Sequence, residues 1–264
     1  KDFWSATWQP VGKPLSEYRS ECRHGTSYSV MSSEYDRIRT ETTYFVPLGA
    51  IHELWKVTIT NTDDARRSLR AFTYVEYAAS WNAIDDLLNL QYVQYTSQVQ
   101  PVDGIIDHGT NVNIPEMPDN FREKDQGRHT FQAIAGAEIS GWDCDREAFL
   151  GGVYRTYANP QVVEDGQAGN SVAYGDNPCG SLQVDVDLDP GESKTFIVIL
   201  GIGRAGKEGA AARRAYTEDP GRADRELAEL KQHWHGRMEG FSAETPDPEL
   251  NSTINTWGIY NSLI

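Results

Sequence analysis

Hydrophobic and polar residues alternate along most of the chain between Ser27 and about Leu200. The pattern is clearest in Ser181–Ile202, where four aliphatic residues alternate with an amide and three acids (Leu182, Val184, Val186 and Leu188; Gln183, Asp185, Asp187 and Asp189). A period of two is typical of a strand with one buried face and one face in water. The sequence Asp-Pro-Gly-Glu-Ser then predicts a turn, and the apolar run up to Leu200 predicts a more fully buried return strand. We therefore expect an antiparallel hairpin here.

A second pair of strand patterns lies earlier in the chain. Residues His52–Asn61 and Ser68–Ala78 are rich in β-branched and aromatic residues, and a polar segment, NTDDARR, overlaps the end of the first run and leads to the second. Two such runs joined by a polar turn predict another hairpin. Together these segments predict a mainly β fold with antiparallel sheets.

The spacing of hydrophobic residues changes after Gly203. In Arg222–Phe241 they recur every three or four residues (Leu227, Leu230, Trp234 and Met238), as on one face of a helix. A further helical pattern begins after Pro248 (Leu250, Ile254, Trp257 and Ile259). We therefore expect a β-sandwich over residues 1–203, a helical linker over residues 204–245, and the first helix of another domain over residues 246–264.

Charge and cysteine content limit the partners and the compartment. The 264 residues carry a formal charge of −15, and because nucleic-acid binding needs a basic face, we expect no nucleic-acid partner. The three cysteines are an odd number without a CxxC spacing, which predicts neither a disulfide framework nor a zinc site and favours the cytoplasm. The longest apolar run is too short to cross a bilayer, so we expect no membrane partner.

The two ends of the sequence suggest a fragment. The chain begins with Lys1 rather than methionine, inside an aromatic segment, and its last helical pattern stops without a capping signal. We therefore expect further sequence before Lys1 and after Ile264.

Two motifs suggest a cofactor or a metal but have simpler explanations. Residues 201–206 match GxGxxG, yet the preceding strand belongs to the expected antiparallel hairpin and no return strand follows, so we expect no dinucleotide site. His233 and His235 lie two residues apart in a helical pattern and therefore on different faces, which argues against a shared metal ion. We expect no metal site.

An acidic segment allows two interpretations. Asp143, Asp145 and Glu147 lie close enough in sequence to form a pair of catalytic carboxylates. Runs of charged residues are, however, usually solvated. We favour an exposed acidic loop paired with Arg146.

The segment Tyr74–Gln91, YVEYAASWNAIDDLLNLQ, starts like a strand and continues with amides, acids and one tryptophan. An indole ring stacks on the apolar face of a pyranose, and amides and carboxylates hydrogen-bond its hydroxyl groups. Asparagine and aspartate also occur in turns for local reasons. Both a sugar-contacting loop and an ordinary turn remain open from these residues alone.

Seven segments, taken together and in this order, resemble the N-terminal part of the inverting glycoside phosphorylases of glycoside hydrolase family 94, which includes cellobiose, cellodextrin and chitobiose phosphorylases (FWSATWQPV, YRSECRHGTSYSVMSSEYDRI, ETTYFVPL, ELWKVTITN, YVEYAASWNAIDDLLNLQ, GWDCDREAFLGG and NSVAYGDNPCGSLQVDVDLDPGESKTFIVILG). The resemblance implies an antiparallel β super-sandwich of the galactose mutarotase-like kind. It also implies a helical linker that leads into an (α/α)6 barrel outside this chain.

The resemblance further implies a hexosyltransferase activity. Members of the family reversibly phosphorolyse a β-linked di- or oligosaccharide with inversion, which yields an α-sugar 1-phosphate. Inorganic phosphate is the co-substrate, and no other cofactor is implied. The family's general acid, an aspartate, lies in the barrel beyond Ile264, so we assign no catalytic residue here and expect this piece alone to be inactive.

The family's sandwich loop, roughly WNAxDDxxNxQ, matches this chain from Trp81 to Gln91. It implies that Asn82, Asn89 and Gln91 border the sugar, with Trp81, Asp85 and Asp86 as structural support. Arg23 and His24 match another family segment, for which a structural role is equally open. The family also implies a homodimer in which the sandwich of one subunit reaches toward the other's active site.

Departures from the family pattern leave the donor sugar, linkage and acceptor open. Tyr92 stands where a basic residue is common, and the segment between Gln94 and Phe131 does not follow the cellobiose phosphorylase pattern. Two other functions also remain possible: a carbohydrate-binding sandwich without catalysis, and part of a glucoamylase-like hydrolase.

Overall fold

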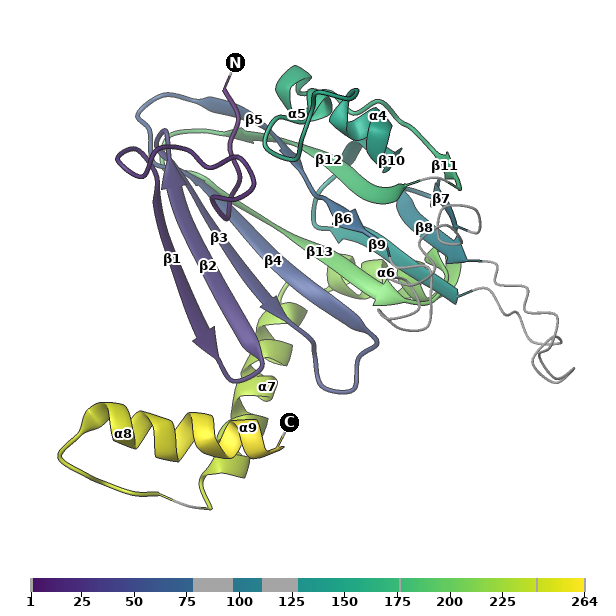
Figure 1. Cartoon of the computed structure of the whole chain (residues 1–264). Helices are drawn as coiled ribbons and strands as arrows, with labels where there is room; N and C mark the ends of the chain where they lie inside the picture. The colour runs from purple at the N-terminus through teal and green to yellow at the C-terminus, as the bar shows by residue number, and fades with distance from the viewer. Residues whose placement is uncertain (1, 78–96, 111–127, 176, 241, 264) are drawn as a thin grey trace, which may run out of the picture.

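The computed structural model describes residues 2–77, 97–110, 128–175, 177–240 and 242–263. These residues form a two-sheet sandwich followed by helices, and the larger sheet has the strand order β1-β2-β3-β4-β13-β9-β8-β7-β11. Figure 1 shows helices α7, α8 and α9 projecting from one end of the sandwich. The described residues therefore show the mainly β, antiparallel fold that the sequence predicts.

The larger sheet contains nine strands in the described part of the chain, and its paired strands are antiparallel. Its members are β1 (Arg19–Gly25), β2 (Tyr28–Tyr35), β3 (Ile38–Phe45), β4 (His52–Asn61), β7 (Ser97–Val102), β8 (Ile105–Thr110), β9 (Arg128–Ala135), β11 (Ala173–Tyr174) and β13 (Ser193–Ile202).

The smaller sheet has the order β10-β12-β5, and β6 also pairs with β12. Its strands are β5 (Arg67–Phe72), β6 (Val75–Glu76), β10 (Ile139–Asp145) and β12 (Pro178–Leu188). In β12 the four alternating aliphatic residues are buried, as predicted, and Asp185 and Asp187 are exposed. Gln183 was expected to face water but is buried, because its Oε1 accepts a 2.7 Å hydrogen bond from the backbone of Ala168.

The helices are α4 (Arg146–Leu150), α5 (Gln161–Asp165), α6 (Ala210–Glu218), α7 (Arg222–Met238), α8 (Pro248–Ser252) and α9 (Ile259–Leu263). Short π-helical turns precede α6 (Ala205–Gly209) and join α8 to α9 (Thr253–Gly258). Helices after Gly203 and after Pro248 were both predicted. On α7 the expected apolar stripe includes the buried Leu230 and Met238.

Strand β13 lies in the middle of the larger sheet and is buried on both faces. Phe196 and Val198 belong to the core between the two sheets. Ile197 and Ile199 point the other way and pack with residues of α6 and α7. The unbroken apolar run in this strand therefore reflects a position between the smaller sheet and the helices.

Neither predicted hairpin exists as such. Strand β4 pairs with β3 and β13, whereas β5 pairs with β12. Likewise β12 lies in the smaller sheet and β13 in the larger. Both polar turns are therefore arches that carry the chain from one sheet to the other.

Hairpins with two-residue connections join β1 to β2, β2 to β3 and β7 to β8. Strands β7 and β8 are joined through Asp103 and Gly104, which have φ values of 51° and 73°. Left-handed conformations at both positions match the twist of the flanking strands, and glycine adopts one without steric cost. Connection length alone does not distinguish hairpins from arches, because β3 and β4 also form a hairpin across the longer connection 46–51.

Asn61, which is fully buried at the end of β4, ties the two arches together. Its side-chain amide donates to the carbonyls of Ala65, Leu188 and Asp189 at 2.8, 3.1 and 3.2 Å. Its side-chain oxygen accepts from the backbone of Asp63 at 2.9 Å. One amide thus bonds backbone groups from both arches, and buried backbone groups need such partners.

A hydrogen-bonded chain fastens the helices to the larger sheet. His52 Nε2, at the start of β4, lies 2.8 Å from Tyr216 Oη in α6. The Tyr216 hydroxyl donates to Glu226 in α7 at 2.7 Å. Since Arg222 also donates to Glu226 at 2.7 Å, three elements share one network.

Candidate functional site

The main residues predicted to border a sugar, Asn82, Asn89 and Gln91, lie outside the described residues, as does Trp81. The last described residue before their segment is Tyr77, and the first described residue after it is Ser97. The structure therefore bears on that prediction only through the residues at which the segment starts and ends.

Tyr77 is the last described residue before 78–96, and it packs against the core between the two sheets. Its ring stacks on the imidazole of His108 in β8, with centroids 4.6 Å apart and planes 11° apart. His108 is followed two residues later by the last described residue before 111–127. The stack therefore joins the bases of two connecting segments, 78–96 and 111–127.

Buried polar atoms surround this stack. Among the described residues, Tyr77 Oη, Ser97 Oγ, His108 Nε2 and Gln132 Oε1 are buried without a hydrogen-bond partner. His108 is anchored through Nδ1, which lies 2.9 Å from Thr130 Oγ1. Gln132 is anchored through its amide nitrogen, which donates to Thr73 at 2.9 Å. The remaining atom of each residue is free for another partner.

The cluster is electrically neutral near pH 7. Burial lowers the pKa of His108 to about 4; Asp107 opposes this effect and His129 adds to it. Burial also raises the pKa of Tyr77 well above its usual value. A neutral imidazole and a neutral phenol are hydrogen-bonding groups here, not charges.

A carboxylate lies at the base of the same segment. Glu76 Oε1 accepts a 2.8 Å hydrogen bond from Tyr74 and a second from Tyr157. Burial raises the pKa of both phenols, and their bonds to Glu76 raise it further. Tyr74 also packs on Phe149 of α4 with centroids 4.8 Å apart. Glu76 and Tyr74, just before Tyr77, are therefore held in place by Tyr157 and Phe149.

The structure places the neighbouring candidates Arg23 and His24 on opposite faces of edge strand β1. Arg23 lies 3.6 Å from Glu21 and is exposed. His24 Nδ1 lies 2.8 Å from Ser29 Oγ in β2, and its Nε2 lies 3.3 Å from Cys22 Sγ. The two side chains therefore face different surfaces of the sheet.

The face that carries His24 continues across the larger sheet. The register pairs His24 with Ser29, Ser29 with Tyr44, and Tyr44 with Trp55. Trp55 donates its indole N–H to Glu53 at 2.6 Å and meets Tyr44 edge-on, with centroids 5.7 Å apart. Figure 1 shows β1–β4 fanning out beyond the smaller sheet, so this polar and aromatic face is only partly covered.

Sequence reasoning missed Tyr44, Glu53 and Trp55. The signal that exists is the alternation in His52–Asn61, which puts Glu53 and Trp55 on one side of a strand. Tyr44 and Glu53 also line an open pocket of about 560 Å³, together with Trp234 and Tyr260. Aromatic rings beside a carboxylate can hold a polyhydroxylated ligand.

The acidic segment is the end of a strand and the start of a helix, not the exposed loop that we expected, although the expected pairing with Arg146 exists at the exposed Glu147, 3.6 Å away. Asp143 lies in β10 and is fully buried. It accepts hydrogen bonds from Gly169 N at 2.9 Å and from Ser171 N and Oγ at 3.1 and 2.7 Å. Asp145 caps α4 by accepting from Ala148 at 2.8 Å. Both carboxylates therefore organise the backbone, and Asp143 in particular holds the segment that covers β12.

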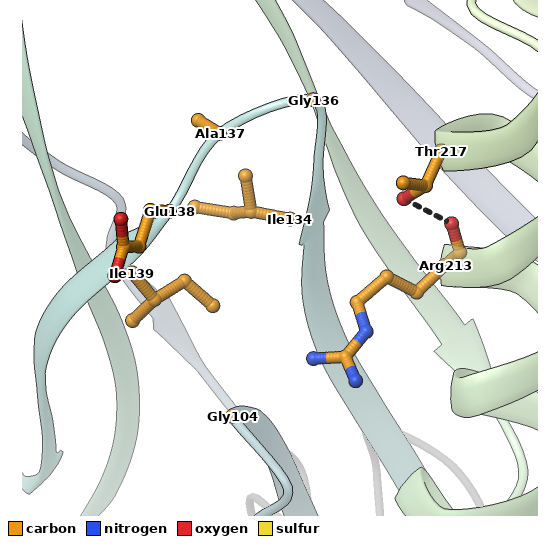
Figure 2. A pocket seen from close by; sticks show the side chains of 8 residues that line it. All are labelled: Gly104, Ile134, Gly136, Ala137, Glu138, Ile139, Arg213 and Thr217. Atoms are coloured by element: carbon orange, nitrogen blue, oxygen red, sulfur yellow. Dashed lines mark hydrogen bonds between the residues drawn. The ribbon is translucent and has the colours of Figure 1, made fainter.

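A second pocket, of about 600 Å³, lies at the other end of β8 and β9. Its wall combines the glycines of two tight turns with the side chains of Ile134 and Ile139. Figure 2 shows Arg213 and Glu138 on opposite sides of it. Arg213 donates to the carbonyl of Asp103 at 2.7 Å, which ties α6 to the turn between β7 and β8.

The described residues contain neither a candidate metal site nor a candidate membrane span. No group of three or more His, Cys, Asp or Glu side chains in those ranges is arranged to hold a metal ion. No helix among those residues combines the length and apolarity that a membrane span requires.

Comparison with known proteins identifies the fold family. The model of the family "Glycosyl hydrolase 94, supersandwich domain" matches residues 1–219. The chain belongs to this family. The predicted resemblance to family 94 and the predicted super-sandwich fold are thus confirmed.

Relatives of this glycosyl hydrolase 94 chain include several phosphorylases. It is 36% identical over 261 residues to the N,N'-diacetylchitobiose phosphorylase of Vibrio furnissii. That alignment covers 99% of this chain and 31% of the relative. It is 27% identical over 256 residues to the solabiose phosphorylase of Paenibacillus borealis, covering 97% and 31%. The family 94 chain thus spans about a third of the length of these curated relatives.

Among solved structures, a bacterial glucoamylase complexed with acarbose aligns with this family 94 chain at a TM-score of 0.46 and 9% identity. The alignment covers 85% of this chain and 30% of the glucoamylase chain.

Proposed function

We propose that this chain is the N-terminal part of a glycoside phosphorylase that reversibly phosphorolyses a β-linked di- or oligosaccharide, with inversion, to an α-sugar 1-phosphate. The observation that carries the proposal is the 36% identity to a chitobiose phosphorylase, which extends over 99% of the chain. A second chitobiose phosphorylase, from Vibrio proteolyticus, is 34% identical over the same length. β-Linked N-acetylglucosamine disaccharides are therefore the first substrates to test.

The chemistry needs one general acid and a site for phosphate. In an inverting hydrolase a second carboxylate must activate water, whereas phosphate is already an anionic nucleophile. The acid protonates the departing glycosidic oxygen while phosphate attacks the anomeric carbon from the opposite face. We place that acid, an aspartate, in a barrel encoded beyond Ile264, so residues 1–264 alone are expected to be inactive.

Within this chain we assign a role in saccharide binding to Asn82, Asn89 and Gln91. Their amide groups both donate and accept hydrogen bonds, as sugar hydroxyls require. The proposal is supported by the anchoring of the residues just before them: Tyr74 and Tyr157 hold Glu76, and Tyr77 is packed on His108. A rigid base is what a binding loop needs for positional accuracy.

The chain also has expected domain boundaries, an expected oligomeric state and an expected location. We propose a sandwich over residues 1–203, a linker over residues 204–245 and the first barrel helix over residues 246–264. We also propose a homodimer and, because the three cysteines are unpaired thiols, a cytoplasmic location.

The test is phosphate-dependent turnover by the full-length protein. With N,N'-diacetylchitobiose and phosphate we expect an α-sugar 1-phosphate and a free monosaccharide in equal amounts, and no cleavage without phosphate. Sugar release in phosphate-free buffer would instead identify a hydrolase. The loop assignment is tested by Asn89→Ala and Gln91→Ala, each expected to lower kcat/KM by roughly 10- to 100-fold. The exposed Gln167→Ala serves as the matched control.

A further inference from the structure

Four of the seven buried side-chain polar atoms that lack a partner in the described part of the chain lie at one place. They belong to Tyr77, Ser97, His108 and Gln132, and the register puts the last three on the inner face of the larger sheet. More than about 90% of buried polar groups in proteins are hydrogen-bonded, many of them to internal water. Such a concentration at one end of one sheet calls for a specific partner.

Two of these atoms converge beside Gly180 in β12. A Cβ atom on Gly180 would lie 2.7 Å from Gln132 Oε1 and closer still to Tyr77 Oη. Because Tyr77 Oη and Gln132 Oε1 both lie within 2.7 Å of that Cβ position, the two oxygens are at most about 5.4 Å apart. One water molecule can bridge two oxygens that are up to about 5.6 Å apart. Glycine at this position keeps the space for the polar atoms instead of a side chain.

The chemistry of the cluster selects water over an anion. Gln132 offers only its carbonyl oxygen, since its amide nitrogen already donates to Thr73. Tyr77 and Ser97 offer hydroxyls, and His108 is a neutral imidazole. Other groups near the cluster are Thr130, the thiols of Cys144 and Cys179, and Asp107, whose carboxylate bonds His129 and the backbone of Ala205. No cationic side chain among the described residues bonds these four atoms, so an anion has no counter-charge.

We propose that Tyr77 Oη, Gln132 Oε1, His108 Nε2 and Ser97 Oγ bind ordered internal water between the two sheets, and that Tyr77 acts through it as a positioning residue. Tyr77 immediately precedes the segment that carries Asn82, Asn89 and Gln91. The bridging water joins this residue to β9, as its ring stack joins it to β8. The functional half of this inference rests on the proposed phosphorylase activity, whereas the water site does not.

The first test is a crystal structure of the full-length protein at a resolution that shows ordered water. We expect electron density for water within about 3.2 Å of both Tyr77 Oη and Gln132 Oε1. A direct bond between these two atoms, or an empty space between them, would overturn the proposal whether or not the enzyme phosphorolyses sugars.

The second test is a double-mutant cycle on the full-length enzyme. Tyr77→Phe keeps the ring stack but removes the hydroxyl, and Gln132→Met removes the acceptor together with the bond to Thr73. We expect each to raise KM for the saccharide about 3- to 10-fold with a smaller change in kcat, and the double variant to be little worse than either. Tyr174→Phe, an exposed tyrosine in β11, is the matched control. Additive effects of Tyr77→Phe and Gln132→Met, or an unchanged KM in both, would refute the positioning role.

Discussion

The side-chain amide of Asn61 lies 3.1 Å from the carbonyl oxygen of Leu188, although 127 positions separate the two residues in sequence. This contact holds together the ends of two strands that belong to different sheets. It shows how the sandwich is closed at this end: a buried amide donates hydrogen bonds to backbone carbonyls of both arches.

Replacing Asn61 with alanine should therefore strongly destabilise the sandwich. The change removes the side-chain donor from the buried carbonyl of Leu188 and from two partly buried carbonyls, which costs about 2–4 kcal/mol of unfolding free energy. Urea unfolding followed by tryptophan fluorescence measures this loss. Asp64→Ala, in the same arch but 94% exposed at its side chain, should change stability by less than about 0.5 kcal/mol. Equal effects of the two substitutions would show that Asn61 does not tie the arches.

Asp143→Asn should also destabilise the protein, even though the two side chains have the same shape. The carboxylate accepts bonds from two backbone amides and one hydroxyl, and an amide group would turn one acceptor into a donor facing these N–H groups. We expect a loss of about 2–4 kcal/mol. Thermal unfolding of Asp143→Asn beside Asp189→Asn, an exposed position, provides the comparison. A neutral result at Asp143 would support the solvated loop that the sequence suggested.

The stability of the sandwich should fall between pH 6.5 and about 4 because of His108. Burial holds its folded-state pKa at about 4, below the usual value of 6.5. The unfolded chain therefore binds more protons in this window, and stability is lost as the pH falls. The full effect is about 3 kcal/mol.

Unfolding of His108→Gln across this pH range isolates the contribution of the imidazole, since glutamine does not titrate. The variant should lose less stability on acidification than the parent protein. His235→Gln, at an exposed position on α7, should keep the parent's pH dependence. Parallel curves for His108→Gln and the parent would contradict the assignment.

The three cysteines should differ sharply in reactivity. Cys22 is exposed, whereas Cys144 and Cys179 are buried. Burial, with smaller contributions from Asp143 and Asp145, raises the pKa of Cys144 to about 12, and burial raises the pKa of Cys179 as well. With iodoacetamide at pH 8, peptide mapping should show Cys22 alkylated at least about 100-fold faster than the other two. All three should react at similar rates in urea, and fast native labelling of Cys179 would exclude the packing described for β12.

Several elements of the fold could be predicted from local sequence. The alternation in β12 shows which of its residues face the core, and the spacing of Leu230 and Met238 identifies the buried side of α7. Both patterns follow from backbone geometry, which places side chains on alternate sides of a strand or every third or fourth residue along a helix. They operate over a few residues and need no knowledge of distant partners.

The pairing of strands could not be predicted in the same way. A strand alternates identically whether its neighbour in sequence continues the same sheet or crosses to the opposite one. The arches after Asn61 and after Leu188 therefore look like hairpins until the partners of β5 and β13 are known. The buried state of Asp143 has the same origin, because the groups that it binds come from residues 169–171.

The sequence by itself determined the class of fold, the strands β4, β5, β12 and β13, the helices after Gly203 and the family, because these depend on short-range patterns and on motifs read in order. Only the tertiary structure decided which strands share a sheet, that Tyr77, His108 and Gln132 meet in a buried polar cluster, and that His24 shares a face with Tyr44, Glu53 and Trp55. These groupings join residues that are far apart in the chain. Their proximity follows from strand register and packing between layers, which local patterns do not contain.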